Sequence, residues 1–308
     1  MRILVTGSSG LIGSALVPFL TPGGHRVIRL IRAQSQTPTS GESWGWDPDR
    51  GTMLSAGRDE LDAVVHLAGE NIAGARWTQR QMALIRDSRV RSTRVLSDLI
   101  GRRSPPPKVL VCASAVGYYG DRGDEILREE SASGSGFLPE VCREWEAACQ
   151  PAADKGIRVV NLRIGIVLSP AGGALAKMLT PFKLGAGGVI GTGRQYMSWV
   201  ALDDVVSAIH FALTHESLRG PVNSVAPNAV TNRDFTQTLG RVLSRPTLFP
   251  MPAFVARLAL GEMADALFLA SARVVPARLL EGGFVFRHPD LEGALRHLLG
   301  KEGMKSLA

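Results

Sequence analysis

The sequence predicts an α/β protein, a doubly wound parallel sheet of the Rossmann type with a smaller mixed C-terminal substrate lobe. A short apolar run, residues 2–6, leads directly into a glycine-rich turn and then into a helix-length stretch. Strand-length apolar runs alternate with helix-length segments as far as residue 168. Of the 308 residues, 45% are apolar and only 34 are Gly and 18 Pro, so the chain can build a core and is not of low complexity.

The glycine turn has the spacing Gly7-x-x-Gly10-x-x-Gly13. Gly7 permits a tight turn, Gly10 lets backbone N–H groups approach a pyrophosphate, and Gly13 lets the helix pack closely on the strand. Because the turn joins a strand to a helix, the pattern favours a dinucleotide site over a merely structural turn. The residues expected at the cofactor are Gly7, Ser9, Gly10, Leu11, Ile12 and Gly13.

The second predicted strand, residues 26–31, is followed by Arg32. NAD sites usually place a carboxylate there to hold the ribose hydroxyls, but the first acidic residue of this chain is Glu42. A guanidinium can bind a 2′-phosphate through two N–H groups. The predicted cofactor is therefore NADP(H) rather than NAD, and a solvated arginine at a strand end is the alternative.

The alternation of strands and helices continues beyond this point. We expect strands over 61–68, 108–113 and 157–168, and helices over 79–102 and 138–155. Ligands bind at the carboxyl ends of the strands of such a sheet. The candidate positions are therefore residues 67–69, Ser114 and the segment after Arg163.

Composition excludes several other classes of protein. The three cysteines show no C-x-x-C spacing and the six histidines form no H-E-x-x-H pair, so neither a disulfide framework nor a metal site is predicted. The net charge of +7 is spread along the chain without a basic run, which argues against nucleic acid as a partner. The most apolar C-terminal stretch, 254–275, holds four charged residues, too many for a membrane span. Because the N-terminus has no signal-peptide pattern, we expect a cytoplasmic protein.

Several motifs occur together along the chain. They are Gly7-x-x-Gly10-x-x-Gly13, His66-Leu67-Ala68-Gly69-Glu70-Asn71, Ser88-Arg89-Val90, Ser114 with Tyr118-Tyr119-Gly120, Trp145-Glu146, Gly191-x-Gly193-Arg194-Gln195 with Ser198-Trp199, and Gly261-Glu262-Met263. With them the chain resembles the extended short-chain dehydrogenase/reductases, a group that includes nucleotide-sugar epimerases and dehydratases. The resemblance covers nearly the whole chain and is to the epimerase-like branch with a C-terminal domain of unknown function.

The resemblance implies an NADP-binding Rossmann fold. It implies that Leu67, Ala68 and Arg89 lie at the cofactor, next to the strand-end residue Gly69, and that Val167 lines the nicotinamide side. For Arg89, a surface charge on the predicted helix is the alternative.

The chain departs from this superfamily at the catalytic pair, Tyr-x-x-x-Lys, in which the lysine lowers the tyrosine pKa so that the tyrosine can act as acid or base. The chain has three tyrosines, and none is followed by a lysine four positions on. On the helix through Glu146, residues near Leu138 and Cys142 take the place of the pair. The usual catalytic assignment therefore fails.

Residues close to Ser114 offer a replacement. Our hypothesis is that Ser114 orients a substrate carbonyl and that Tyr118 or Tyr119 acts as the acid. The alternative is that both tyrosines only pack the loop. Cys142 as a nucleophile is a weaker hypothesis, because cysteines within helices are usually inert.

The second half of the chain begins with a glycine-rich basic segment, 172–195, that suits a lobe closing over an anionic substrate. Arg194, Gln195 and Trp199 are the expected substrate-binding residues, with Trp199 offering a flat face to a base or sugar. Turns that only connect short elements are the alternative. Beyond a proline-rich stretch, 246–252, the pattern predicts two or three amphipathic helices.

These observations predict an NADP-binding domain over 1–168, a substrate lobe over 169–245 and a helical C-terminal domain over 246–308. The main functional hypothesis is an NADP(H)-dependent oxidoreductase or epimerase acting on a small polar substrate such as a nucleotide sugar. The alternative is a catalytically silent NADP(H) sensor or scaffold, which the loss of the Tyr–Lys pair would permit.

Overall fold

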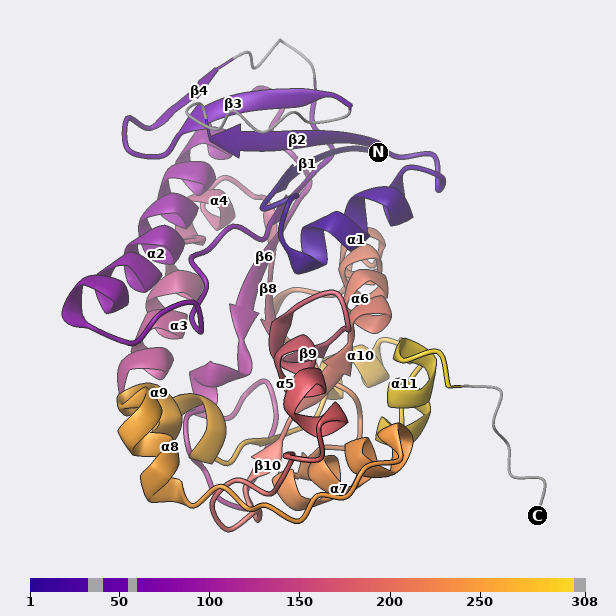
Figure 1. The fold of residues 1–308 in the computed structure, drawn as a ribbon. Helices are drawn as coiled ribbons and strands as arrows, with labels where there is room; N and C mark the ends of the chain where they lie inside the picture. Colours follow the sequence, from indigo (N-terminus) through magenta and orange to yellow (C-terminus); the bar gives the residue numbers. More distant parts are fainter. Residues whose placement is uncertain (33–40, 55–59, 302–308) are drawn as a thin grey trace. The chain divides into compact units, whose positions relative to one another are not determined.

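The computed structural model describes residues 1–32, 41–54 and 60–301. The chain forms two compact units and passes from one to the other several times (Figure 1). Unit 1 contains 1–115, 140–163 and 206–222, and unit 2 contains 116–139, 164–205 and 223–308. The domain boundaries at 168 and 245 stay predictions.

Unit 1 is built around the largest sheet in the described part of the chain, with the strand order β12-β8-β6-β5-β1-β2-β3-β4. Its strands are β1 (Arg2–Thr6), β2 (Arg26–Arg32), β3 (Ser43–Asp47), β4 (Thr52–Leu54), β5 (Ala63–His66), β6 (Val109–Ala115), β8 (Arg158–Ile164) and β12 (Gly220–Ser224). The central pairs β1–β2, β1–β5, β5–β6 and β2–β3 are parallel, and β4 adds an antiparallel edge. The predicted Rossmann-type α/β fold is confirmed.

Helices cover both faces of this sheet, with α1 on one side and α2 and α3 on the other (Figure 1). The helices of this part are α1 (Leu11–Leu20), α2 (Gln79–Gly101), α3 (Phe137–Ala147), α4 (Gln150–Ala153) and α6 (Leu202–Thr214). Strands covered on both faces read as continuous apolar runs, which is why the sequence revealed them. Ile3, Val64 and Leu110, from three neighbouring strands, are completely buried.

Two predicted elements of this region are wrong in their extent. The helix predicted over 138–155 ends at Ala147, where i→i−3 hydrogen bonds at Ala148 and Cys149 tighten the last turn and Pro151 opens a separate short helix. The strand predicted over 157–168 is interrupted at Gly165, where a Cβ atom would lie 2.5 Å from the carbonyl oxygen of Ser198. The segment after Gly165 leaves the large sheet and pairs with β11 instead.

Unit 2 is assembled from short elements. They are η1 (Val116–Tyr119), β7 (Ile126–Leu127), β9 (Ile166–Leu168), α5 (Gly173–Lys183), β10 (Tyr196–Met197), β11 (Trp199–Ala201), β13 (Val230–Thr231), α7 (Asn232–Leu243), α8 (Ala253–Leu260), α9 (Glu262–Ala264), η2 (Asp265–Leu269), β14 (Arg273–Val274), α10 (Ala277–Glu281) and α11 (Leu291–Leu298). Helices α5, α7 and α11 share an apolar core centred on Trp199, Phe235 and Leu295. The C-terminal region is therefore more broken up than the two or three helices predicted for it.

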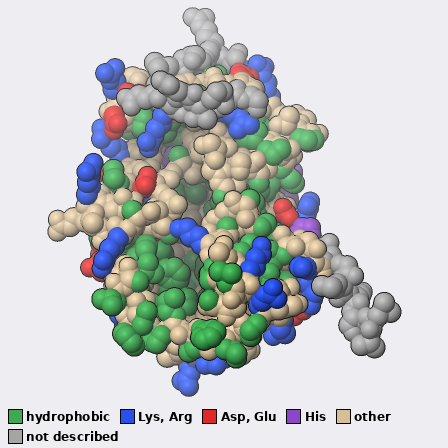
Figure 2. Space-filling model, viewed as in Figure 1, with side chains coloured by type: hydrophobic (Ala, Val, Ile, Leu, Met, Phe, Trp, Pro, Cys, Tyr) green, Lys and Arg blue, Asp and Glu red, His purple; other side chains and the backbone are tan. Residues whose placement is uncertain are grey.

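Helix α8 and the segment before it contribute little to this core. Leu248, Phe254 and Leu258 are each at least 70% exposed, whereas Ala256 is buried. Figure 2 shows hydrophobic side chains gathered on the lower part of the face, where Figure 1 places α8 and α9. None of the helices within the described ranges is long and apolar enough to cross a membrane.

Candidate dinucleotide site and catalytic residues

At two positions of the glycine turn after β1, nearby backbone atoms leave no room for a side chain. Gly7 has φ +65°, and a Cβ atom there would lie 2.7 Å from the carbonyl carbon of Leu67. A Cβ atom on Gly13 would lie 2.2 Å from the carbonyl oxygen of Gly7. At Gly10 a Cβ atom would lie 3.3 Å from the carbonyl oxygen of Gly7, a tight contact that a shift of a few tenths of an ångström would relieve. The turn therefore has the geometry that the Gly-x-x-Gly-x-x-Gly spacing predicts.

Gly10 is also the N-cap residue of α1, and it offers no side-chain acceptor to the first N–H groups of the helix. Ser9 and Gly10 are exposed, and Leu11 and Ile12 are half-buried. Exposed helix N–H groups with a favourable dipole make an anion site. These residues fit the pyrophosphate of a dinucleotide.

Thr6, which the sequence reading missed, connects this turn to the end of β5. Its Oγ1 accepts hydrogen bonds from the backbone N–H groups of Leu67 (3.1 Å) and Ala68 (3.2 Å). The same Oγ1 lies 2.6 Å from Nδ1 of the buried His66. The 67–68 segment is thus held against Gly7 by one threonine hydroxyl.

Arg89, on α2, is held by protein groups rather than by solvent, so the surface-charge alternative is wrong. Its guanidinium donates to the carbonyl oxygens of Ile85 (3.0 Å) and Glu70 (2.9 Å) and lies 5.1 Å from the centre of the Trp145 ring. A Cβ atom on Gly69 would lie 3.2 Å from the guanidinium carbon, so the two residues are in contact. Burial lowers the pKa of Arg89. Arg89 thereby fixes the loop that follows β5.

Arg32 lies at the end of β2 and is exposed. Its position matches the predicted one, at the carboxyl end of the strand next to β1. Residues 33–40, which follow it, lie outside the described residues.

Ser114, near the end of β6, belongs to a buried charged group. Its hydroxyl donates to Oε1 of Glu146 at 2.7 Å, and Glu146 forms a two-pronged ion pair with Arg163 at 2.8 and 2.9 Å. The side chains of Glu146 and Arg163 are 13% and 3% exposed, and Ser114 is 3% exposed. Because a carboxylate only accepts, the Ser114 proton points to Glu146, and its oxygen lone pairs point elsewhere. The prediction that Ser114 orients a substrate carbonyl stays a prediction, and in this structure its proton is engaged by Glu146.

The two tyrosines after Ser114 have different environments. Tyr119 is completely buried, and its hydroxyl lies 2.7 Å from Oδ1 of Asn223 and 3.0 Å from the carbonyl oxygen of Arg128. Both acceptors of its hydroxyl proton lie inside unit 2, so Tyr119 cannot donate this proton to a substrate. Tyr118 is half-buried and packs edge-to-face on the Tyr119 ring.

Tyr119 takes part in a larger buried network that the sequence did not indicate. Asn223 donates to the carbonyl oxygen of Val275, and Oε1 of the buried Glu129 accepts the backbone N–H groups of Asn223 and Arg278. Burial raises the pKa of Glu129. This network ties three distant segments of unit 2 together.

Cys142 is no nucleophile. All three cysteines, Cys112, Cys142 and Cys149, are buried. Burial raises the pKa of Cys142 to about 12, so its thiol stays protonated near neutral pH.

The expected substrate-binding residues of unit 2 fall into two groups. Trp199 is completely buried, and its Nε1 donates to the carbonyl oxygen of Asn228, so it has no face for a ligand. Gln195 is 7% exposed and donates to the carbonyl oxygens of Ile190 and Phe268. Both were wrongly predicted to bind substrate, since both hold the fold. Arg194 is exposed, and Val167 is half-buried on β9.

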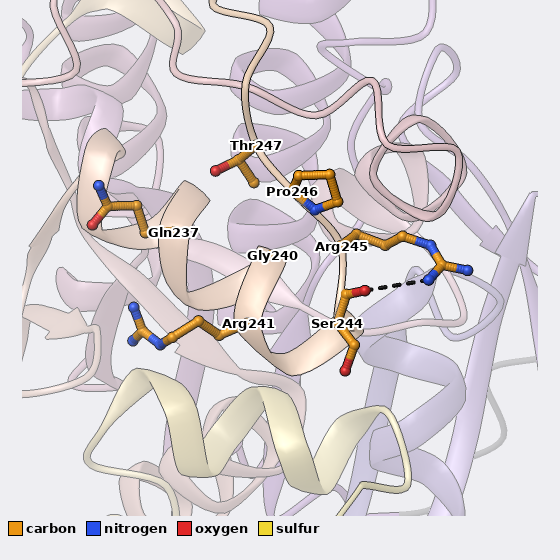
Figure 3. Close-up of a pocket in the computed structure, with 7 residues that line it drawn as sticks. All are labelled: Gln237, Gly240, Arg241, Ser244, Arg245, Pro246 and Thr247. Atoms are coloured by element: carbon orange, nitrogen blue, oxygen red, sulfur yellow. Dashed lines mark hydrogen bonds between the residues drawn. The ribbon is translucent and has the colours of Figure 1, made fainter.

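A surface pocket lies elsewhere in unit 2, at the C-terminal end of α7 (Figure 3). It is lined by Gln237, Gly240, Arg241, Ser244, Arg245, Pro246 and Thr247. Arg245 donates to the carbonyl oxygens of Lys183 and Ser244, and Arg241 pairs with Glu292. Its arginines are therefore used in the fold, and the pocket contains none of the predicted site residues. Lys and Arg side chains are scattered over the face shown in Figure 2 rather than gathered in a stripe.

Comparisons with known proteins agree with the geometry. Residues 3–225 match the model of the NAD dependent epimerase/dehydratase family, and residues 251–298 match a domain of unknown function, DUF1731. An epimerase family protein of Mycobacterium bovis is 42% identical over 98% of both chains.

Two solved structures are similar over 97% of this chain. The human epimerase family protein SDR39U1 (isoform 2), crystallised with NADPH, has 34% identity and a TM-score of 0.88, with 99% of that chain covered. A nucleoside-diphosphate sugar epimerase from Corynebacterium glutamicum has 40% identity and a TM-score of 0.79, with 58% of that chain covered. The resemblance that the motifs indicated is confirmed, and the chain belongs to the NAD-dependent epimerase/dehydratase family, with a DUF1731 domain over residues 251–298.

Proposed function

We propose that this protein binds NADP(H) at the glycine turn of unit 1 and uses it to oxidise and reduce a small polar substrate, with nucleotide sugars as the first class to test. The observation that carries the proposal is the turn after β1, which admits only glycine at positions 7 and 13 and presents the uncapped N-terminus of α1. The NADPH in the crystal structure of human SDR39U1 supports the choice of cofactor.

The position of Arg32 supports NADP(H) over NAD. The side chain lies exposed at the end of β2, where a guanidinium can bind the 2′-phosphate that distinguishes the two cofactors. Leu67, Ala68 and Gly69 form the proposed neighbouring wall, which Thr6 and Arg89 hold in place. Val167 is the proposed residue on the nicotinamide side.

Ser114 and Glu146 supply the proposed proton path in place of the absent Tyr–Lys pair. The Ser114 oxygen accepts the hydroxyl proton of the substrate while Ser114 passes its own proton to Glu146. The carbon–hydrogen bond of the substrate breaks with both electrons, and the bound nicotinamide accepts this hydride, so that the alcohol becomes a carbonyl. Arg163 balances the Glu146 charge inside the protein before the proton arrives.

Tyr118 and Arg194 complete the proposal. Tyr118, which follows Ser114 by four residues, is the remaining candidate for the acid that protonates a carbonyl oxygen in the reverse direction. Arg194 is the candidate for an anionic group of the substrate, because it is exposed within the glycine-rich segment.

The first experiment tests the cofactor. NADPH and NADH are titrated separately into the protein, and binding is followed by fluorescence. We expect NADPH to bind more tightly, and Arg32→Glu to weaken NADPH binding by at least about tenfold without weakening NADH, since one charge-assisted contact contributes about 1.5–3 kcal/mol. Arg50→Glu, a charge reversal at an 82% exposed side chain, is the matched control. Equal affinity of the unaltered protein for both cofactors would overturn the assignment of Arg32.

The second experiment tests turnover. Oxidised and reduced cofactor are incubated with a panel of nucleotide sugars, aldehydes and quinones, and the nicotinamide absorbance and the epimeric products are monitored. Turnover that is lost in Ser114→Ala supports the proposal. Tight NADPH binding without turnover on any member of the panel would overturn the catalytic half and leave a binding protein.

A further inference from the structure

We propose that Asp203, His288 and His297 of unit 2 form a binding site for a divalent transition-metal ion such as Zn²⁺, independent of the proposed function. Nε2 of His297 lies 3.3 Å from Oδ2 of Asp203, and Nε2 of His288 lies 3.8 Å from the same oxygen. One ligand atom from each residue lies within 4.8 Å of the other two.

Both histidine–aspartate distances are close to those of a zinc site. Zinc binds imidazole nitrogen and carboxylate oxygen at about 2.0–2.2 Å, so the ligand atoms of a tetrahedral site lie about 3.4 Å apart. The His297–Asp203 distance already has this value, and the His288–Asp203 distance exceeds it by a few tenths of an ångström. Two imidazoles and one carboxylate are also the donor set that suits zinc and its neighbours among the transition metals.

The backbone around His288 is fixed by the aspartate next to Asp203. Asp204 is completely buried, and its carboxylate accepts the backbone N–H groups of Arg287 (2.8 Å) and His288 (3.1 Å). The start of α6 therefore supplies one aspartate that anchors the 287–288 backbone and a neighbouring aspartate that faces the imidazole. Such fixing of a ligand by surrounding hydrogen bonds is usual in metal sites.

His297 is placed by α11, whose first turn and buried face are both secured. Asp290 caps the helix by accepting the N–H of Gly293 at 2.8 Å, and Leu291 and Leu295 pack into the core of unit 2. The His288 and His297 rings are stacked with their centres 4.4 Å apart and their planes 28° apart. Metal binding requires the more exposed ring, His297, to tilt so that both nitrogens converge.

The site is open on one side, which suits a metal that keeps a water molecule. The side chains of Asp203 and His297 are 44% and 40% exposed, whereas that of His288 is 14% exposed. Three protein ligands with an open fourth position bind exchangeable metal. Bound metal would link the start of α6 to the end of α11, because it would join Asp203 and His297, which lie 94 residues apart in the sequence.

A protonated His297 would also pair with Asp203 without any metal, since Asp203 lies in the first turn of α6 and His297 in the last turn of α11. The test must therefore measure the metal directly. Tag-free protein is stripped with a chelator and titrated with Zn²⁺ alone in competition with a chromophoric chelator. The expected result is one equivalent bound, with Kd in the micromolar range or below, and a rise in Tm with added Zn²⁺.

Single substitutions locate the site. His297→Ala and Asp203→Asn are expected to weaken Zn²⁺ binding by at least tenfold, and the Tm of each metal-free variant shows whether the fold is kept. Co²⁺ replaces Zn²⁺ in a parallel titration, where the visible absorption of a four-coordinate ion is expected in the unaltered protein and absent from His297→Ala. His25 and His210 of unit 1, whose rings are 5.5 Å apart, are the competing pair, and His25→Ala is the control.

Three results would overturn the proposal. They are no Zn²⁺ binding to the stripped protein, binding that His297→Ala and Asp203→Asn leave unchanged, and binding that only His25→Ala removes. NADPH affinity, measured in the same variants, is expected to stay unchanged, which separates this site from the proposed cofactor site.

Discussion

Thr6 and His66 end two neighbouring parallel strands, β1 and β5, and Oγ1 of Thr6 lies 2.6 Å from Nδ1 of His66. Because Thr6 Oγ1 already accepts two backbone N–H groups, it donates its proton to Nδ1, and His66 carries its own proton on Nε2. Nε2 of His66 is buried and has no hydrogen-bond partner among the described residues. The hydroxyl thus fixes both the loop after β5 and the tautomer of His66.

The first prediction concerns the pH dependence of stability. Complete burial lowers the pKa of His66 to about 4, below the ordinary value of 6.5. The unfolded chain therefore binds a proton that the folded protein excludes, and stability falls as the pH falls from about 6.5 towards 4. We expect His66 to account for a loss of about 2 kcal/mol at pH near 5.

Urea unfolding of the unaltered protein and of His66→Asn, which keeps an acceptor for Thr6, measures this loss as the difference between the two pH profiles. Burial also lowers the pKa values of His25 and His210, and their contribution is common to both proteins. Parallel profiles would contradict the prediction.

The second prediction concerns Thr6 itself. Thr6→Val keeps the shape but removes the acceptor of the Leu67 and Ala68 N–H groups, and each buried unsatisfied group costs about 1–3 kcal/mol. We expect a loss of about 2–4 kcal/mol in the free energy of unfolding and weaker NADPH binding, because the 67–68 segment loses its anchor. Thr6→Ser keeps the hydroxyl and should retain both properties. Equal behaviour of the two variants in denaturant unfolding and NADPH titration would refute this role.

Local signals account for the parts of the fold that the sequence predicted. The strands of the sheet are apolar runs because both their faces are covered. The glycine turn can be recognised in the sequence because backbone atoms lie too close to Gly7 and Gly13 for any side chain to fit there. The break in the predicted strand at Gly165 was missed because its cause, the Ser198 carbonyl, lies 33 residues away. Local patterns carry no information about such an approach.

The same distinction applies to the candidate site. Tyr119, Gln195 and Trp199 have residue types that often bind ligands, but long-range packing buries them, and no local pattern reveals burial. Conversely, Glu146 gains its proposed role from Ser114, 32 residues earlier in the chain. Spatial partners of this kind emerge only from the fold.

The third prediction addresses the buried ion pair. Glu146→Leu leaves the Arg163 guanidinium charged and buried without its carboxylate, and removal of one partner of a buried pair costs about 3–5 kcal/mol. Glu146→Gln keeps one acceptor oxygen and should cost less, yet it cannot take a proton from Ser114. We therefore expect Glu146→Gln to fold, to bind NADPH normally and to lose turnover together with its pH dependence. Full turnover in Glu146→Gln would exclude Glu146 from the proton path.

The fourth prediction uses two glycines three residues apart. Gly13→Ala places a Cβ atom 2.2 Å from the Gly7 carbonyl oxygen and is expected to destabilise the protein and abolish dinucleotide binding. Gly10→Ala places its Cβ atom 3.3 Å from the same oxygen, which needs a shift of only a few tenths of an ångström, so the fold should survive while the methyl group obstructs the approach of a pyrophosphate. Thermal unfolding and NADPH titration of both variants check this. Unchanged NADPH affinity in Gly10→Ala would indicate that the pyrophosphate lies elsewhere.

The fifth prediction separates the two adjacent tyrosines. Tyr119→Phe removes the hydroxyl that satisfies Asn223 Oδ1 inside unit 2, so we expect a loss of about 1–3 kcal/mol in the free energy of unfolding. Tyr118→Phe keeps the half-buried ring that packs on Tyr119 and should slow turnover if Tyr118 is the acid. Denaturant unfolding gives the first comparison and initial rates give the second. A stable Tyr119→Phe that loses turnover, beside a fully active Tyr118→Phe, would reverse the two roles and place the acid on the buried hydroxyl.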